Sequence, residues 1–143
     1  MKENNLIVLP VRGGSKSIKK KNIFLLNNRP LLDYVVSEIS KLKKNCILAV
    51  SSDDANILNS VKKNNKIQII KIKRPKNLSG DFVTLDPVIF HAFEYSEKKT
   101  GILFDKIITV QATSPLLNIE DIKKAINFFN TKKFDSLVSV IED

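Results

Sequence analysis

Several residue types are scarce in this chain of 143 residues, and each scarcity narrows the chemistry available to it. There is one cysteine, one histidine, no tryptophan and only four glycines. One cysteine cannot form an internal disulfide, and without a Cys/His cluster there is no structural zinc site. No apolar run is long enough to span a bilayer, and the amino terminus leads into a strand pattern rather than a signal-peptide core. We therefore expect a cytoplasmic protein with no membrane partner.

The single cysteine and the single histidine both lie in structural patterns. Cys46 opens the apolar run 46–50, where a buried small hydrophobe is expected rather than a nucleophile or a metal ligand. His91 lies within a predicted helix, away from every candidate motif, and nothing places it near a serine that it could activate. We predict a catalytic role for neither residue.

Acidic residues are few relative to basic ones, which leaves a formal net charge of +9. This balance favours an anionic partner, either a nucleic acid or a small anion. However, the lysines are spread along the chain, and no aromatic residues interleave with them as a base-stacking platform requires. A small anionic substrate is expected and nucleic acid is not. A basic nucleic-acid-binding module is the alternative from another class, and salt-dependent oligonucleotide binding would favour it.

Strand-like and helix-like segments alternate along the whole chain. Apolar runs predict five strands, at 6–9, 47–50, 67–70, 107–110 and 136–141. Helices are predicted to begin beside residues that favour such starts, namely Pro30, Asp53 or Asp54, Thr84 and Asn118. This rhythm indicates one α/β domain over residues 1–143, with a Rossmann-like, mostly parallel sheet and helices on both faces. Ligands of such folds bind beyond the carboxyl ends of the strands.

The segment after the first predicted strand, residues 11–22, reads Val-Arg-Gly-Gly-Ser-Lys-Ser-Ile-Lys-Lys-Lys-Asn. Two of the four glycines are adjacent here, and such a pair lets the backbone turn sharply and direct N–H groups at one spot. Five cationic side chains in the same segment favour a polyanion such as a nucleoside triphosphate. The spacing fits neither the Walker A loop nor the dinucleotide fingerprint. A different class of nucleotide-binding protein is therefore indicated.

Four motifs occur in order along the chain: Pro10-Val11-Arg12-Gly13-Gly14-Ser15-Lys16 with Lys21-Asn22, then Ser51-Ser52-Asp53, Arg74-Pro75-x-x-Leu78-x-x-Asp81, and Gln111-x-Thr113-Ser114-Pro115-Leu116. Together they resemble the acylneuraminate cytidylyltransferase family over the full 143 residues. The Gln-x-Thr-Ser-Pro form resembles the sialic-acid branch more than the enzymes for eight-carbon sugars. The chain departs from the family pattern at Ser17 (usually glycine), Lys19 (usually proline) and Gly80 (often serine).

The resemblance implies a nucleotidyltransferase that attaches CMP from CTP to a sialic-acid-like, acidic nine-carbon sugar and releases pyrophosphate. It implies that Arg12 and Lys21 are the catalytic residues. The nucleotide-binding set is Arg12, Gly13, Gly14, Ser15, Lys16, Lys21, Asn22, Arg74, Ser79 and Asp81. Gln111 would contact the sugar. The alternatives are a cytidylyltransferase for another acidic sugar (legionaminic, pseudaminic or ketodeoxy-octulosonic acid) and a silent nucleotide-binding fragment.

Relatives in this family continue beyond the fifth strand. The resemblance implies that their second half carries the segment that forms a homodimer and the acidic residues that bind the Mg²⁺ cofactor. We therefore interpret the domain as shortened at its carboxyl end and assign no metal ligand within it. The expectation is CTP binding with negligible pyrophosphate release by the 143 residues alone.

Overall fold

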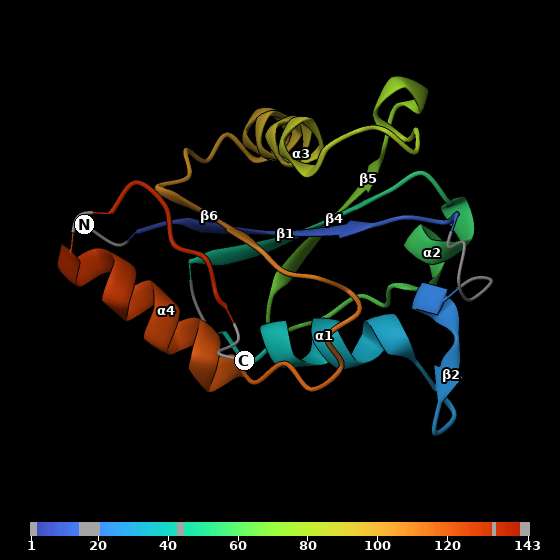
Figure 1. The fold of residues 1–143 in the computed structure, drawn as a ribbon, viewed down its shortest axis with the longest axis horizontal. Helices are drawn as coiled ribbons and strands as arrows, with labels where there is room; N and C mark the ends of the chain where they lie inside the picture. Colours follow the sequence, from blue (N-terminus) through green and yellow to red (C-terminus); the bar gives the residue numbers. More distant parts are fainter. Residues whose placement is uncertain (1–2, 15–20, 43–44, 133, 141–143) are drawn as a thin grey trace.

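The computed structural model describes residues 3–14, 21–42, 45–132 and 134–140. Its central sheet has four parallel strands in the spatial order β5-β4-β1-β6 (Figure 1). The strands are β1 (Asn5–Val11), β4 (Cys46–Ser52), β5 (Gln68–Lys73) and β6 (Lys106–Thr109). The apolar runs therefore predicted four parallel strands correctly, each within a few residues of its observed bounds.

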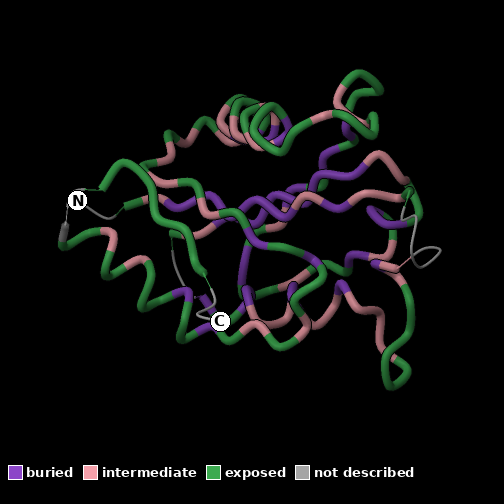
Figure 2. The backbone as a smooth tube through the Cα atoms, viewed as in Figure 1, coloured by how far each residue is buried: buried purple, intermediate pink, exposed green. Residues whose placement is uncertain are grey.

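Helices cover both faces of the sheet, as the βαβα rhythm predicted. One face packs on α1 (Leu31–Ile39), α2 (Ala55–Ser60) and α4 (Ile119–Lys132), and the other packs on α3 (Leu85–Thr100) (Figure 1). Successive side chains of a strand point to opposite faces. Leu6 and Val8 therefore pack on the α3 side, whereas Ile7 and Leu9 pack on the other. The centre of the sheet is the most buried part of the chain (Figure 2).

The predicted helix starts are confirmed. Pro30 immediately precedes α1, and Asp54 precedes α2 and accepts a hydrogen bond from the N–H of Asn56 at 2.7 Å. Thr84 precedes α3 but makes no capping hydrogen bond with its side chain. Asn118 precedes α4 and accepts a bond from the N–H of Glu120 at 2.9 Å. Capping side chains of this kind satisfy N–H groups that a helix cannot pair internally.

A short hairpin was not predicted. Strands β2 (Leu25–Leu26) and β3 (Arg29–Pro30) pair antiparallel, and Asn27 and Asn28 between them have φ values of 49° and 60°. Asparagine tolerates this left-handed region, which two-residue hairpin turns require. The Asn-Asn pair was therefore the available signal. Two 3₁₀ turns, η1 (Lys21–Ile23) and η2 (Lys76–Leu78), complete the set of described elements.

The prediction of a fifth strand at 136–141 is wrong for its described part. Residues 136–140 form no strand, and Val138 and Val140 are 77% and 86% exposed. An apolar run becomes a strand only when a neighbouring strand pairs with it. No described strand pairs with this segment, and Ile141 lies outside the described residues.

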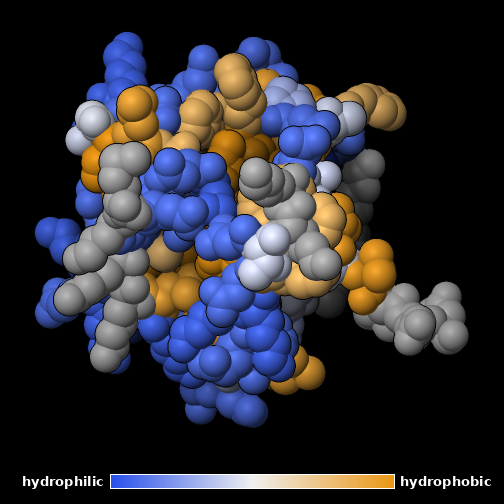
Figure 3. Space-filling view, turned by 90° about the vertical axis from the view of Figure 1, so that its left-hand side faces the viewer, coloured by the Kyte–Doolittle hydropathy of each residue, from blue (hydrophilic) through white to orange (hydrophobic). Residues whose placement is uncertain are grey.

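The beginnings and the carboxyl ends of the strands lie at opposite ends of the molecule. Figure 3 looks onto the end where β1 begins, and most of this face is hydrophilic with apolar areas between. The carboxyl ends of the strands lie at the opposite end, beside α2 (Figure 1). Within the described ranges, no helix is both long and apolar enough to cross a membrane.

Candidate functional site

The carboxyl ends of β1, β4 and β5 bring three of the sequence motifs together. The register pairs Val11 of β1 with Ser52 of β4, and Ser52 with Lys73 of β5. The residues that follow these strands, Arg12-Gly13-Gly14, Asp53-Asp54 and Arg74, therefore emerge at one edge of the sheet, as parallel pairing requires. This edge is where ligands of open α/β sheets bind.

The turn that begins at Gly13 packs closely against the end of β4. Its N–H donates to Oδ1 of Asp53 at 2.9 Å. A Cβ atom at Gly13 would lie 2.7 Å from Cβ of Asp54, closer than real side chains approach. Neither Gly13 nor Gly14 has a positive φ, so it is the close approach that requires glycine at position 13. Asp53 is not among the predicted site residues, although it belongs to the Ser51-Ser52-Asp53 motif, which was the available signal.

Arg12 lies across this turn. A Cβ at Gly14 would lie 3.7 Å from its Nε and 3.8 Å from its Nη2. The Nη2 group is paired with Oδ1 of Asp81, and the two side chains are 38% and 40% exposed. The Nε atom is buried and has no hydrogen-bond partner among the described residues. The guanidinium therefore has an unused donor beside the glycine pair.

Asn22 and Lys21 enter the site through η1. Asn22 is buried, and its Nδ2 donates to the main-chain oxygen of Arg12 at 2.8 Å. This bond ties the end of the 11–22 segment to its start. Lys21 is half-buried at the adjacent position. The predicted phosphate contacts of Ser15 and Lys16, and the departures at Ser17 and Lys19, lie outside the described residues.

Arg74 is the most buried charged residue of the site, at 8% exposure. Its Nη2 donates to the main-chain oxygens of Ser51 at 2.9 Å and Val11 at 3.4 Å, and its Nε donates to Oγ of Ser51 at 3.3 Å. Burial lowers the pKa of the guanidinium, the charge of Asp53 opposes that change, and Arg12 adds to it. Arg74 thus joins the ends of β1 and β4, and its predicted contact with a nucleoside stays a prediction.

The remaining predicted residues lie around this cluster. Ser79 donates from its hydroxyl to the main-chain oxygen of Pro75 at 2.8 Å, and Asp81 is two residues further on. Gln111 is exposed and follows β6, on the other side of β1 from Arg74. Its main-chain oxygen accepts from the N–H of Ser114 at 3.3 Å. The structure therefore places Gln111 at the same sheet edge as the turn, across β1 from the Ser79–Asp81 loop.

The described residues contain no group of three or more His, Cys, Asp or Glu side chains arranged to hold a metal ion. Asp53 and Asp81 instead accept bonds from Gly13 and Arg12. Cys46 is half-buried, where full burial was predicted, and burial raises the pKa of its thiol. His91 is half-buried on α3 with its ring 6.3 Å from that of Tyr95.

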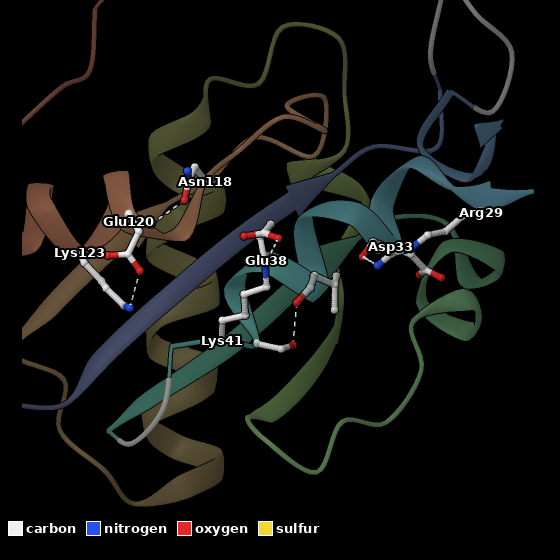
Figure 4. Close-up of polar contacts among 9 residues, drawn as sticks. Arg29, Asp33, Glu38, Lys41, Asn118, Glu120 and Lys123 are labelled. Atoms are coloured by element: carbon white, nitrogen blue, oxygen red, sulfur yellow. Dashed lines mark hydrogen bonds and ion pairs between the residues drawn. The ribbon is translucent and has the colours of Figure 1, made fainter. Parts of the chain in front are cut away.

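Two surface hollows lie away from the glycine turn. One, of about 250 Å³, is at the start of β4 and β5 and includes Cys46 and Gln68. The other, of about 300 Å³, lies between α1 and residues 115–118. Figure 4 shows its polar surroundings, in which Lys41 pairs with Glu38, and Lys123 pairs with Glu120 at 2.7 Å. None of the described site residues lines either hollow.

Comparisons with known proteins identify relatives of this chain. A family model described as cytidylyltransferase matches residues 6–143. A pseudaminic acid cytidylyltransferase of Campylobacter jejuni subsp. jejuni serotype O:2 is 34% identical over 133 residues, which cover 91% of this chain and 56% of that protein. An N-acylneuraminate cytidylyltransferase of Escherichia coli O18:K1:H7 is 24% identical, with 98% and 32% covered.

A solved structure of similar fold is a CMP:2-keto-3-deoxy-manno-octonic acid synthetase in complex with CTP. It has a TM-score of 0.65 and 15% identity, and the match covers 92% of this chain and 49% of the synthetase. The fold and site therefore define an α/β protein of the nucleotide-diphospho-sugar transferase type. This chain belongs to the cytidylyltransferase family, as the four motifs predicted. It spans about half the length of the pseudaminic acid relative.

Proposed function

We propose that this chain carries the nucleotide-binding part of a cytidylyltransferase that transfers CMP from CTP to an acidic nine-carbon sugar. The observation that carries the proposal is the position of Arg12. Its guanidinium lies against Gly14 at the carboxyl end of β1, with a buried Nε that has no partner among the described residues. A planar fork beside a glycine turn suits the oxygens of a triphosphate.

In the proposed reaction, the anomeric hydroxyl oxygen of the sugar attacks the α-phosphorus of CTP. A new P–O bond forms, the bond to the β-phosphate oxygen breaks, and pyrophosphate leaves while the hydroxyl proton is lost to solvent. Such transfers are accelerated mainly by positioning and by neutralising phosphate charge. We assign contact with the β- and γ-phosphates to Arg12 and to the main chain of residues 13–16. We assign contact with the α-phosphate to Lys21.

The base and the sugar are assigned to the flanking loops. We propose that Asn22, Arg74, Ser79 and Asp81 form the nucleoside side, because they lie beyond β1 and β5. Gln111 lies beyond β6, on the other side of β1, which suits an acceptor that approaches the α-phosphate from that side. The 34% identity with a pseudaminic acid cytidylyltransferase favours a nonulosonic acid as the acceptor.

Magnesium dependence, dimer formation and a cytoplasmic location belong to this proposal as properties of the family. The described residues contain no group of three or more His, Cys, Asp or Glu side chains that could hold a metal ion, and Asp53 and Asp81 accept bonds from Gly13 and Arg12. No step of the reaction is therefore assigned to a metal held by the described residues.

Calorimetric titration tests the nucleotide assignment. The chain is expected to bind CTP more tightly than ATP or GTP, since the Arg74–Asp81 loop adjoins the triphosphate turn. Equal affinity for all three triphosphates would remove the cytidine assignment and leave phosphate binding intact. No binding to any of them would overturn the proposal.

The acceptor is tested on the chain saturated with CTP. Pseudaminic, legionaminic, N-acetylneuraminic and ketodeoxy-octulosonic acids are titrated in turn, and each sample is analysed for a CMP-sugar product. Preferential binding of a nine-carbon acid supports the proposal. A preference for the eight-carbon acid would assign the chain to the other branch. A CMP-sugar formed by these 143 residues alone would contradict the expectation of negligible turnover.

A further inference from the structure

Two donors of the turn that suit an anion are engaged by carboxylates of the protein. The N–H of Gly13 donates to Asp53, and Nη2 of Arg12 donates to Asp81. Arg12 and Asp81 are 69 residues apart in the sequence, so their ion pair joins the glycine turn to the loop that follows η2. Two carboxylates of the protein therefore lie on donors that could bind phosphate oxygens.

We infer that Asp81 is a positioning residue whose carboxylate occupies, on Arg12, the place of a phosphate oxygen and yields it to the polyphosphate when nucleotide binds. This inference rests on the proposed function. It gives Asp81, which lies in the loop proposed for the nucleoside side, an additional role on Arg12.

The chemistry of the two partners supports an exchange rather than a permanent bond. Both side chains are more than one-third exposed, and ion pairs exposed to this extent contribute little to stability. A pyrophosphate group offers Arg12 two oxygens in the planar arrangement that a guanidinium prefers, whereas Oδ1 of Asp81 engages Nη2. The buried Nε has no partner among the described residues, so Asp81 leaves one donor of the guanidinium unsatisfied.

Asp81 also balances positive charge at the turn. Unpaired arginine and lysine groups at a turn repel one another, and a carboxylate among them reduces that repulsion. The consequence is a competition: Asp81 holds the guanidinium at the turn and lowers its apparent affinity for phosphate.

The test measures binding of inorganic pyrophosphate and CTP by calorimetry at an ionic strength of about 0.15 M, where exposed charges are screened beyond about 8 Å. Asp81→Asn is compared with Asp86→Asn, a matched control that removes the same charge from an exposed position five residues away. Asp81→Asn is expected to bind pyrophosphate about two to five times more tightly, the range that an exposed ion pair supports. Asp86→Asn is expected to stay within about 1.5-fold of the unaltered chain, because screening weakens distant exposed charges.

A double-mutant cycle separates this exchange from a general charge effect. In the Arg12→Ala background, Asp81→Asn should not raise pyrophosphate affinity beyond the Asp86→Asn control. In the chain that keeps Arg12, Asp81→Glu should retain the affinity of the unaltered chain. Weaker or unchanged pyrophosphate binding by Asp81→Asn would overturn the inference, as would a full gain in the Arg12→Ala background. Tighter pyrophosphate binding by Asp81→Asn, together with equal affinity of the chain for CTP, ATP and GTP, would support the inference and overturn the cytidine assignment. A chain that binds neither ligand would overturn both.

Discussion

Arg12 and Arg74 follow two strands of the same sheet and belong to two motifs of the same family, yet their surroundings differ. Arg74 is 8% exposed and directs its donors at Ser51 and Val11, at the ends of β4 and β1. The Arg12 side chain is 38% exposed, pairs with one carboxylate and keeps a buried Nε without a described partner. Residue type and motif do not distinguish the two, whereas burial and bonding do.

Burial and hydrogen bonding indicate which of the two guanidinium groups stabilises the fold and which can bind a ligand. Hydrogen bonds from the buried guanidinium reach the oxygens of Ser51 and Val11, so Arg74 contributes to the fold that holds the edge together. A guanidinium at the surface with donors to spare contributes little to the fold and is free to meet a ligand. The two arginines should therefore respond oppositely to stability and binding measurements.

The largest effect is expected for Arg74→Met. The substitution leaves the oxygens of Ser51 and Val11 without their donor, which should lower the free energy of unfolding by about 2–4 kcal/mol. Urea denaturation measures the change. Arg29→Met is the matched control, because Arg29 is half-buried, donates to the oxygen of Asp33 at 2.6 Å and lies 4.6 Å from the centre of the Tyr34 ring. Equal losses for the two variants would show that the bonds of Arg74 have no special weight.

The next effect concerns binding. Arg12→Ala should weaken triphosphate binding by about 1.5–3 kcal/mol, because it removes a charge-assisted contact. Lys19→Ala should change it by about a few tenths of a kcal/mol, as expected of a solvated lysine. Calorimetry with CTP compares the two, and urea denaturation should find Arg12→Ala nearly as stable as the unaltered chain. Similar losses of affinity at positions 12 and 19 would mean that the segment is a diffuse positive patch.

The smallest effect separates the two adjacent glycines. Gly13→Ala places a Cβ 2.7 Å from Cβ of Asp54 and should cost about 1–2 kcal/mol of stability through overpacking. Among the described residues, the Cβ added by Gly14→Ala is nearest to Nε of Arg12, at 3.7 Å. The free energy of unfolding of this variant should therefore stay within about 0.5 kcal/mol of the unaltered chain. Thermal or urea unfolding of the pair gives the comparison. A larger loss for Gly14→Ala would contradict the close approach at Gly13.

Local patterns predicted the central strands and helix starts because those features depend on neighbouring residues. The run 6–9 is apolar on both faces, which only a central parallel strand requires, and Asp54 and Asn118 lie where N-caps are needed. The segment 136–140 shows the limit of such patterns. Its apolar residues suit a strand, but a strand also needs a partner, and the amino-acid pattern of one segment does not contain that information.

The candidate site divides in the same way. The glycine pair with its basic residues, and the Arg-Pro and Gln-x-Thr-Ser-Pro motifs, were legible in the chain and pointed to the cytidylyltransferase family. The motifs did not predict which of their side chains stabilise the fold. The motifs assign Asp81 to the nucleotide and give Asp53 no role, whereas in the structure Asp53 accepts from the N–H of Gly13 and Asp81 pairs with Arg12.

By itself, the sequence determined the parallel α/β class, the edge of the sheet that carries the loops and the family to which the chain belongs. These follow from local periodicity and from short motifs. Only the tertiary structure decided that Arg74 is buried, that Gly13 packs against Asp54, and that Arg12 meets Asp81 across 69 residues. The physical reason is that burial and ion pairing depend on which distant segments the sheet brings together, and that is a property of the packed chain.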